Sequence, residues 1–99
     1  MAFAIRFAAC VAQQLDHLKA RDRVTVLDAI EHQLTHDPLV EVRHREPLRP
    51  NPVAPWELRV GTLRVFYEVT SAESGVVHVL AVGRKVRNSL RVGGQEIKL

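Results

Sequence analysis

Two runs of alternating apolar and polar residues, 56–60 and 63–69, lie on either side of Gly61 and Thr62. A period of two is typical of a strand with one buried face, and a two-residue break that contains glycine predicts a hairpin. One face of this hairpin would hold Trp56, Leu58, Leu63, Val65 and Tyr67. The other would hold Glu57, Arg59, Arg64, Phe66 and Glu68. Guanidinium groups on neighbouring strands repel each other, so the second face should need an anionic partner or flanking carboxylates.

The first 37 residues predict a strand followed by two helices. Residues 2–7 alternate between apolar and polar side chains, which indicates a short strand. Apolar positions recur at helical spacing over residues 8–18, and a second amphipathic segment follows Asp22, which we expect to cap that helix. The apolar stripe of the second helix comprises Val24, Leu27, Ile30 and Leu34. Asp37 and Pro38 should end it, so the helices form a hairpin, and each should bury one stripe against the sheet.

The rest of the chain predicts a loop and further strands. Residues 38–55 hold all five prolines and show no helical period, so we expect a loop. Residues 71–75 should form a turn, and residues 76–82 are apolar on both faces, as in an interior strand. The tail, residues 95–99, has two possible states, an edge strand or a loose end. These elements predict a compact α/β or α+β fold.

Length and composition limit the class of protein. With 99 residues, the chain is predicted to be a single domain, residues 1–99. One cysteine, Cys10, excludes an internal disulfide and is typical of a reducing compartment. No apolar run approaches the ~20 residues of a membrane span, and the first residues lack the basic and long apolar regions of a signal peptide. We therefore expect a soluble, cytoplasmic protein with no membrane partner.

Charge is distributed unevenly along the chain. Residues 1–37 hold four Lys or Arg against five Asp or Glu, whereas residues 38–99 hold ten against six. The balance of +4 in the second part indicates a polyanion or an acidic protein as the partner.

Two groups of residues offer candidate binding chemistry. His32 and His36 have a spacing that can hold a metal, but Gln33 stands where the zinc-protease motif has Glu, and no third ligand is indicated, so we expect no metal site. Residues 43–49 gather arginines in the proline-rich loop. This loop could be a solvated basic segment or an edge that contacts phosphates, since Arg forks match phosphate oxygens.

The order of several short motifs resembles the RelE/ParE family of toxins from type II toxin–antitoxin systems. The motifs are Asp37-Pro38, Glu46-Pro47-Leu48, residues 56–61 (WELRVG), residues 63–67 (LRVFY) and residues 82–85 (VGRK), and they cover essentially the whole chain. The resemblance implies an α+β fold of order β-α-α-β-β-β, in which two N-terminal helices pack on one face of a small, twisted, mainly antiparallel sheet.

The resemblance also implies an activity. RelE-like members cut mRNA in the ribosomal A site without a metal or cofactor, whereas ParE-like members poison DNA gyrase. A cognate antitoxin protein neutralises both. In RNA cutting the 2′-hydroxyl attacks the adjacent phosphate, so the site needs a base, a proton donor for the leaving 5′-oxygen, and cations for the phosphorane. The expected partners are therefore an antitoxin, together with the ribosome and mRNA or, alternatively, DNA gyrase.

By the same resemblance, site residues are expected on the sheet and in the basic segment after its last long strand. The catalytic candidates are Glu46, Arg59, Arg64, Lys85 and Arg87. The RNA-binding candidates are Arg43, Arg45, Arg49, Arg84 and Arg91. We expect Arg59 and Arg64 to lie close together on the face opposite the helices, largely accessible to solvent. RNA-cutting members often carry a Tyr where this chain reads 88–91 (NSLR), and no aromatic residue follows Tyr67. A toxin that acts only by binding therefore remains an alternative.

Overall fold

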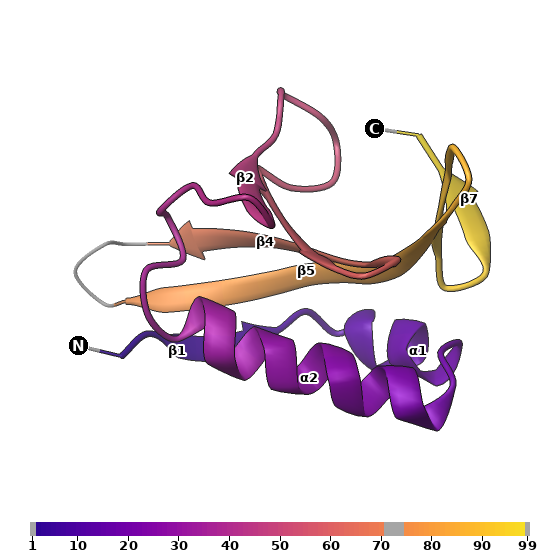
Figure 1. Ribbon diagram of the computed structural model, residues 1–99, viewed down its shortest axis with the longest axis horizontal. Helices are drawn as coiled ribbons and strands as arrows, with labels where there is room; N and C mark the ends of the chain where they lie inside the picture. Colours follow the sequence, from indigo (N-terminus) through magenta and orange to yellow (C-terminus); the bar gives the residue numbers. More distant parts are fainter. Residues whose placement is uncertain (1, 71–74, 99) are drawn as a thin grey trace.

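A computed structural model describes residues 2–70 and 75–98. The elements, in chain order, are β1 (Ala4–Phe7), α1 (Val11–Asp16), α2 (Ala20–Leu34), β2 (Arg45–Pro47), β3 (Trp56–Val60), β4 (Leu63–Thr70), β5 (Val76–Val86), β6 (Ser89–Val92) and β7 (Gln95–Ile97). Figure 1 shows both helices on one side of the sheet, while β2 and the β6–β7 hairpin rise on the other side. No helix in the described part of the chain is long and apolar enough to span a membrane.

The sheet runs β2-β3-β4-β5-β6-β7 with antiparallel neighbours, and β1 lies parallel to the first part of β5. β5 is long enough to pair with β1 over residues 76–79 and with β6 over residues 83–86. The α+β class and the two helices on one face are therefore confirmed. The sheet is larger than expected, because part of the proline-rich loop forms β2 and the tail pairs as an edge strand, β7. The expected turn at residues 71–75 lies, except for Gly75, outside the described residues.

The main core lies between the helices and the sheet. Val26, Ile30 and Leu34 of α2 are buried against the sheet face that carries Leu58 and Val65, among others. Their spacing of four residues places them on one side of the helix. The alternation of the central hairpin therefore predicted correctly which face turns toward the helices.

Tyr67 joins this core to the loop that follows α2. Its ring is fully buried, and its hydroxyl donates a hydrogen bond of 2.6 Å to the carbonyl oxygen of Pro38. Burial raises the pKa of Tyr67 far above its ordinary value, and the nearby charge of Arg45 offsets part of that increase.

Two details of α2 differ from the sequence prediction. The helix begins at Ala20, after Lys19, so Asp22 lies in the first turn and is not the N-cap. Asp22 instead forms an ion pair with Arg84 of β5. Val24 is 61% exposed and Leu27 is also exposed, so the predicted stripe was wrong at both positions. Val26 takes the buried place because it lies one turn before Ile30.

α1 is shorter than the periodic segment that predicted it. The helix spans Val11–Asp16, and residues 8–10 connect it to β1. Val11 is fully buried and Leu18 nearly so, which explains why the apolar spacing extends beyond the helix itself.

A second, smaller core covers part of the opposite face of the sheet. Phe66 is fully buried there together with Ala54, Ala81 and Leu90. The proline-rich loop and the β6–β7 hairpin supply the partly buried side chains around it, namely Leu48, Val53, Leu80, Val92 and Ile97. The sequence placed Phe66 on a charged face, but these distant segments enclose it.

Gly83 permits the bend that brings β6 over this face. A Cβ atom at this position would lie 2.3 Å from the backbone oxygen of Arg91 and 2.8 Å from a methyl group of Val92. Such distances are far below van der Waals contact, so only glycine allows β5 and β6 to approach this closely.

Candidate functional site

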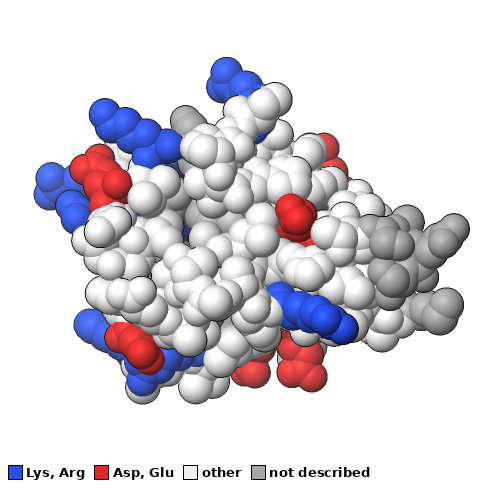
Figure 2. Space-filling view, turned by 180° about the vertical axis from the view of Figure 1, so that it is seen from behind, with Lys and Arg blue, Asp and Glu red and all other residues white. Residues whose placement is uncertain are grey.

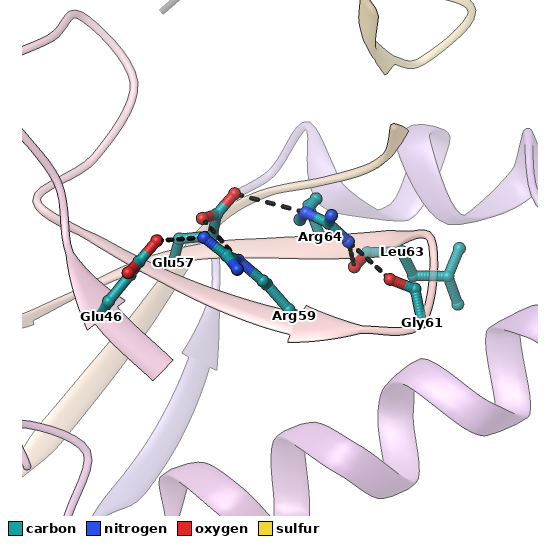
Figure 3. A network of polar contacts seen from close by, with 6 residues as sticks. All are labelled: Glu46, Glu57, Arg59, Gly61, Leu63 and Arg64. Carbon is teal, nitrogen blue, oxygen red and sulfur yellow. Dashed lines mark hydrogen bonds and ion pairs between the residues drawn. The ribbon is translucent and has the colours of Figure 1, made fainter. Parts of the chain in front are cut away.

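Arg59 and Arg64 face each other across the β3–β4 hairpin, on the side of the sheet away from the helices. They are register partners in the antiparallel pairing, as are Glu57 and Phe66 further from the turn. Figure 3 shows the two guanidinium groups on the same side of the hairpin, with Glu57 in contact with both. The predicted face and the predicted closeness of the two arginines are therefore confirmed.

Carboxylates surround both guanidinium groups. Glu57 lies 3.5 Å from Arg59 Nε through one oxygen and 3.5 Å from Arg64 Nε through the other. Glu46, which is the register partner of Glu57 in the β2–β3 pairing, forms an ion pair with Arg59. Two positive and two negative charges thus alternate across three strands, which removes the repulsion expected for adjacent arginines.

Glu57 is the member of this network that sequence reasoning did not select. Glu57 is buried, yet its carboxylate contacts both arginines. Its position two residues before Arg59 places it on the same face, and this was the available signal. The sequence position of Glu57 did not show that it contacts both arginines, because a carboxylate on this face of the sheet can equally point into solvent.

The two arginines differ in accessibility. The side chain of Arg59 is 46% exposed, whereas that of Arg64 is only 14% exposed, so the expectation of two accessible guanidiniums was wrong for Arg64. Arg64 Nη1 donates hydrogen bonds of 2.7 Å to the carbonyl oxygen of Gly61 and 2.9 Å to its neighbour Leu63. The guanidinium of Arg64 thus folds back over the turn.

The other two catalytic candidates lie outside this network. Lys85 is exposed and stands two residues after Gly83, the register partner of Arg64, which places it on the same face of β5. Arg87 is exposed at the β5–β6 turn, where its φ is 56°. The structure therefore brings together Glu46, Arg59 and Arg64, and it gives neither Lys85 nor Arg87 a contact with them.

The RNA-binding candidates are distributed over different surfaces. Arg43 and Arg49 are exposed on the segment before β2 and on the proline-rich loop. Arg84 turns toward the helices through its ion pair with Asp22, and Arg91 is its register partner on β6. These four arginines come from separate segments, and Figure 2 shows Lys and Arg on one face in separate groups with uncharged surface between them.

Arg45 has a structural role that does not agree with phosphate binding. It is 6% exposed, and its guanidinium donates to the carbonyl oxygens of Val40 and Gln33, at 2.8 Å each. The side chain of Gln33 accepts a further, longer bond of 3.4 Å. Arg45 thus ties the segment before β2 to the end of α2, and its donors are directed into the protein.

The described residues contain no cluster of metal-ligating side chains. Among residues 2–70 and 75–98, no group of three or more His, Cys, Asp or Glu side chains could hold a metal ion. The Nδ1 atom of His32 lies 2.8 Å from the carbonyl oxygen of Asp28, one turn earlier in the same helix, and carries the proton of this hydrogen bond.

The network combines a carboxylate with guanidinium donors. Glu46 is partly exposed and could accept a proton, and the guanidinium of Arg59 could donate to phosphate oxygens. A phosphate that approaches must compete with the carboxylates for the same donors. The site therefore suits an anion that offers several oxygens at once.

Comparison with known proteins rests on structure. No protein-family model matches the chain, and no curated protein sequence does so either. Among solved structures, a chain of the RelBE2 toxin–antitoxin complex from Mycobacterium tuberculosis is similar with a TM-score of 0.73 and 26% identity, over 86% of this chain and 93% of that one.

A second solved structure has the same fold at lower identity. It is a chain of the archaeal RelE–RelB complex from Pyrococcus horikoshii OT3, with a TM-score of 0.62 and 19% identity, over 88% of this chain and 99% of that one. This second likeness shows the fold alone, whereas the first, together with the strand order and the paired helices on one face, supports a RelE-family toxin.

Proposed function

We propose that this chain is the toxin of a type II toxin–antitoxin pair and that it cuts ribosome-bound mRNA without a metal. The observation that carries the proposal is the cross-strand pair of Arg59 and Arg64 with Glu46 beside it, on the face away from the helices. Guanidinium groups on a rigid sheet can stabilise a phosphorane because they are positioned before the reaction begins.

The reaction assigns one role to each group. Glu46 removes the proton of the RNA 2′-hydroxyl, and the resulting oxygen attacks the adjacent phosphorus. Arg59 and Arg64 bind the phosphorane oxygens. The bond from phosphorus to the 5′-oxygen then breaks, and the exposed ammonium of Lys85 is our candidate donor of the proton to that oxygen. The products are a 2′,3′-cyclic phosphate and a free 5′-hydroxyl.

The ion pairs imply that RNA binding rearranges the network. Arg59 is bound to Glu46 and near Glu57, so the incoming phosphate replaces at least one carboxylate. Arg59 and Glu46 are both partly exposed, so their pair is the easier one to open. Glu57 is buried and remains between the arginines. The proposal therefore predicts that Arg59 moves and Arg64 stays.

An antitoxin is the second part of this proposal. Both similar structures are complexes of a toxin with an antitoxin. The excess of Lys and Arg in residues 38–99 suits an acidic protein that covers the basic surfaces. We expect the purified chain to bind the product of its adjacent gene at micromolar concentration, and absence of such binding would contradict this part.

A toxin that acts only by binding, for instance on DNA gyrase, is the second candidate. Two observations favour it: carboxylates already pair both guanidiniums, and no aromatic residue follows Tyr67 to stack on a base. In this alternative the basic face serves as a docking surface, and Glu46 has no chemical role.

The test compares the two targets with matched variants. Primer extension on translated mRNA and a gyrase supercoiling assay are run with wild type, Arg59→Ala and Arg6→Ala. Arg59→Ala should slow cutting by about 30- to 1000-fold, the usual effect of losing one donor to the transition state. Arg6→Ala removes the same charge from the exposed surface of β1 and should leave cutting unchanged.

Each outcome identifies a different mechanism. Cut message that depends on Arg59 supports the nuclease. Intact message together with loss of supercoiling supports gyrase inhibition. Growth inhibition that neither assay explains would indicate a toxin with another target.

A further inference from the structure

A small hollow on the helix side of the sheet gathers basic groups that take no part in the proposed cleavage step. It has a volume of about 160 Å³ and lies between α1, β5 and the turn that joins β6 to β7. The polar side chains that line it are Gln14, His17, Arg84 and Arg91. No carboxylate lines it. Given roughly 30 Å³ per water molecule, this hollow has room for one phosphate group and a few waters.

Arg84 and Arg91 form the charged side of the hollow. They are register partners in the β5–β6 pairing, so their side chains leave the sheet next to each other. Asp22 of α2 and the hydroxyl of Thr62 hold the guanidinium of Arg84. Arg91 is exposed, and it forms no side-chain ion pair or hydrogen bond within the part of the chain that the structure describes.

Glu96 is the register partner of Arg91 on β7, but the two form no ion pair among the described residues. Its carboxylate accepts a hydrogen bond of 3.1 Å from the hydroxyl of Ser89, and it lines a different hollow, next to Lys85. Arg91 therefore lies beside the oriented guanidinium of Arg84, without an ion pair of its own in the described residues.

α1 supplies further donors. The backbone N–H of Val82 donates to Gln14 Oε1 at 2.9 Å, which fixes the amide and leaves its NH₂ group as the donor. His17 Nδ1 lies 3.0 Å from the carbonyl oxygen of Gln13, so Nδ1 carries the proton in that bond. Gly94 passes so close to this ring that a Cβ there would lie 3.1 Å from it. The β6–β7 turn thus closes the hollow on one side.

From this arrangement we infer that the hollow binds a phosphate group, as a second anion site on the side of the sheet opposite Glu46, Arg59 and Arg64. Two arginines and Gln14, from three elements, line this hollow. A tetrahedral phosphate can accept from all of them, whereas a carboxylate has only two oxygens. A free nucleotide and the backbone of single-stranded RNA are the two sources of such a phosphate, and both present the same chemistry.

The inference goes beyond the proposed function and does not depend on it. Its site uses residues of the helix side, and it requires binding without any bond cleavage. Loss of RNA cutting would leave it intact, and absence of phosphate binding would leave the nuclease proposal intact.

The test is an NMR titration of the full chain with inorganic phosphate, uridine 5′-monophosphate and a single-stranded oligoribonucleotide. We expect saturable shifts of the backbone amides of Gly93 and Gly94 with all three. Arg91→Gln should weaken phosphate binding by at least about tenfold, as expected for loss of a charged hydrogen bond. Arg6→Gln, which removes the same charge from β1, should leave it unchanged.

A second variant distinguishes loss of phosphate binding from loss of the fold. Gln14→Glu keeps an oxygen acceptor for the Val82 N–H but adds a negative charge to the hollow, so it should abolish binding while the amide spectrum of the sheet is retained. Tighter binding of the oligonucleotide than of the mononucleotide would identify RNA backbone as the source, and equal binding would identify a free nucleotide. No saturable shift at Gly93 and Gly94, or equal binding of acetate, would overturn the inference.

Discussion

Arg59 and Arg64 are direct cross-strand partners, and like charges in this position normally destabilise a sheet. Glu57 resolves the conflict, because its two oxygens lie 3.5 Å from the Nε atoms of the two arginines. The carboxylate that makes the arginine pair possible is thus also the group that competes with any phosphate for it.

Replacing Glu57 by Gln should destabilise the fold. The amide keeps the shape of the side chain but removes the charge between two guanidiniums, so we expect the free energy of unfolding to fall by about 1–2 kcal/mol. Urea denaturation measures this change. Glu41→Gln, at an exposed position, is the control and should change stability by less than about 0.5 kcal/mol. Equal effects of the two variants would show that Glu57 does not hold the arginines.

Arg45 should behave as a structural residue and not as a surface cation. Arg45→Ala removes three hydrogen bonds to Val40 and Gln33 at a buried position, so we expect a loss of about 2–4 kcal/mol. Arg43→Ala removes the same charge from an exposed position and should change stability by less than about 0.5 kcal/mol. Thermal or urea unfolding of both variants distinguishes these roles, and similar stabilities would contradict the burial of Arg45.

Gly83 should tolerate no side chain. A Cβ atom would meet the backbone oxygen of Arg91 at 2.3 Å, and the backbone of β6 cannot move away without losing its pairing with β5. Gly83→Ala should therefore lower the free energy of unfolding by about 1–3 kcal/mol. Amide exchange should rise most in β6 and β7, because these strands depend on the close approach. Uniform exchange across all strands would point to another cause.

Tyr67 should make stability fall at alkaline pH. Burial raises its pKa in the folded chain, whereas the unfolded chain releases this proton near the ordinary value of about 10. Above that pH the unfolded state binds fewer protons than the folded state, so the free energy of unfolding decreases as pH rises. Tyr67→Phe should lose about 1 kcal/mol at neutral pH, since Pro38 loses its donor, but should show a shallower decline above about pH 10.

Tyr67 can be followed directly, because it is the sole tyrosine of the chain. Tyrosinate absorbance should appear only at a pH where the protein unfolds. A normal titration in the folded chain would contradict the burial of the hydroxyl.

The local pattern of residues predicted the central elements well. Alternation over 56–69 identified the hairpin and placed Arg59 and Arg64 together on the face away from the helices. This was possible because successive side chains of a strand point to opposite faces, so the apolar residues identify the buried face. The same pattern assigned Val24 and Leu27 to a buried stripe, and this was wrong. Two overlapping stripes were compatible with the helical period, and only contact with the sheet selects the one that contains Val26.

The sequence by itself determined the two helices, the central hairpin and the common face of Arg59 and Arg64. Only the tertiary structure decided which charges are free. Arg45 is buried beside Gln33, Arg84 is bound to Asp22, and Glu57 occupies the space between Arg59 and Arg64. The physical reason is that hydrophobic periodicity involves residues only a few positions apart in the sequence. An ion pair depends instead on the distance between side chains from separate strands and helices, and only folding sets that distance.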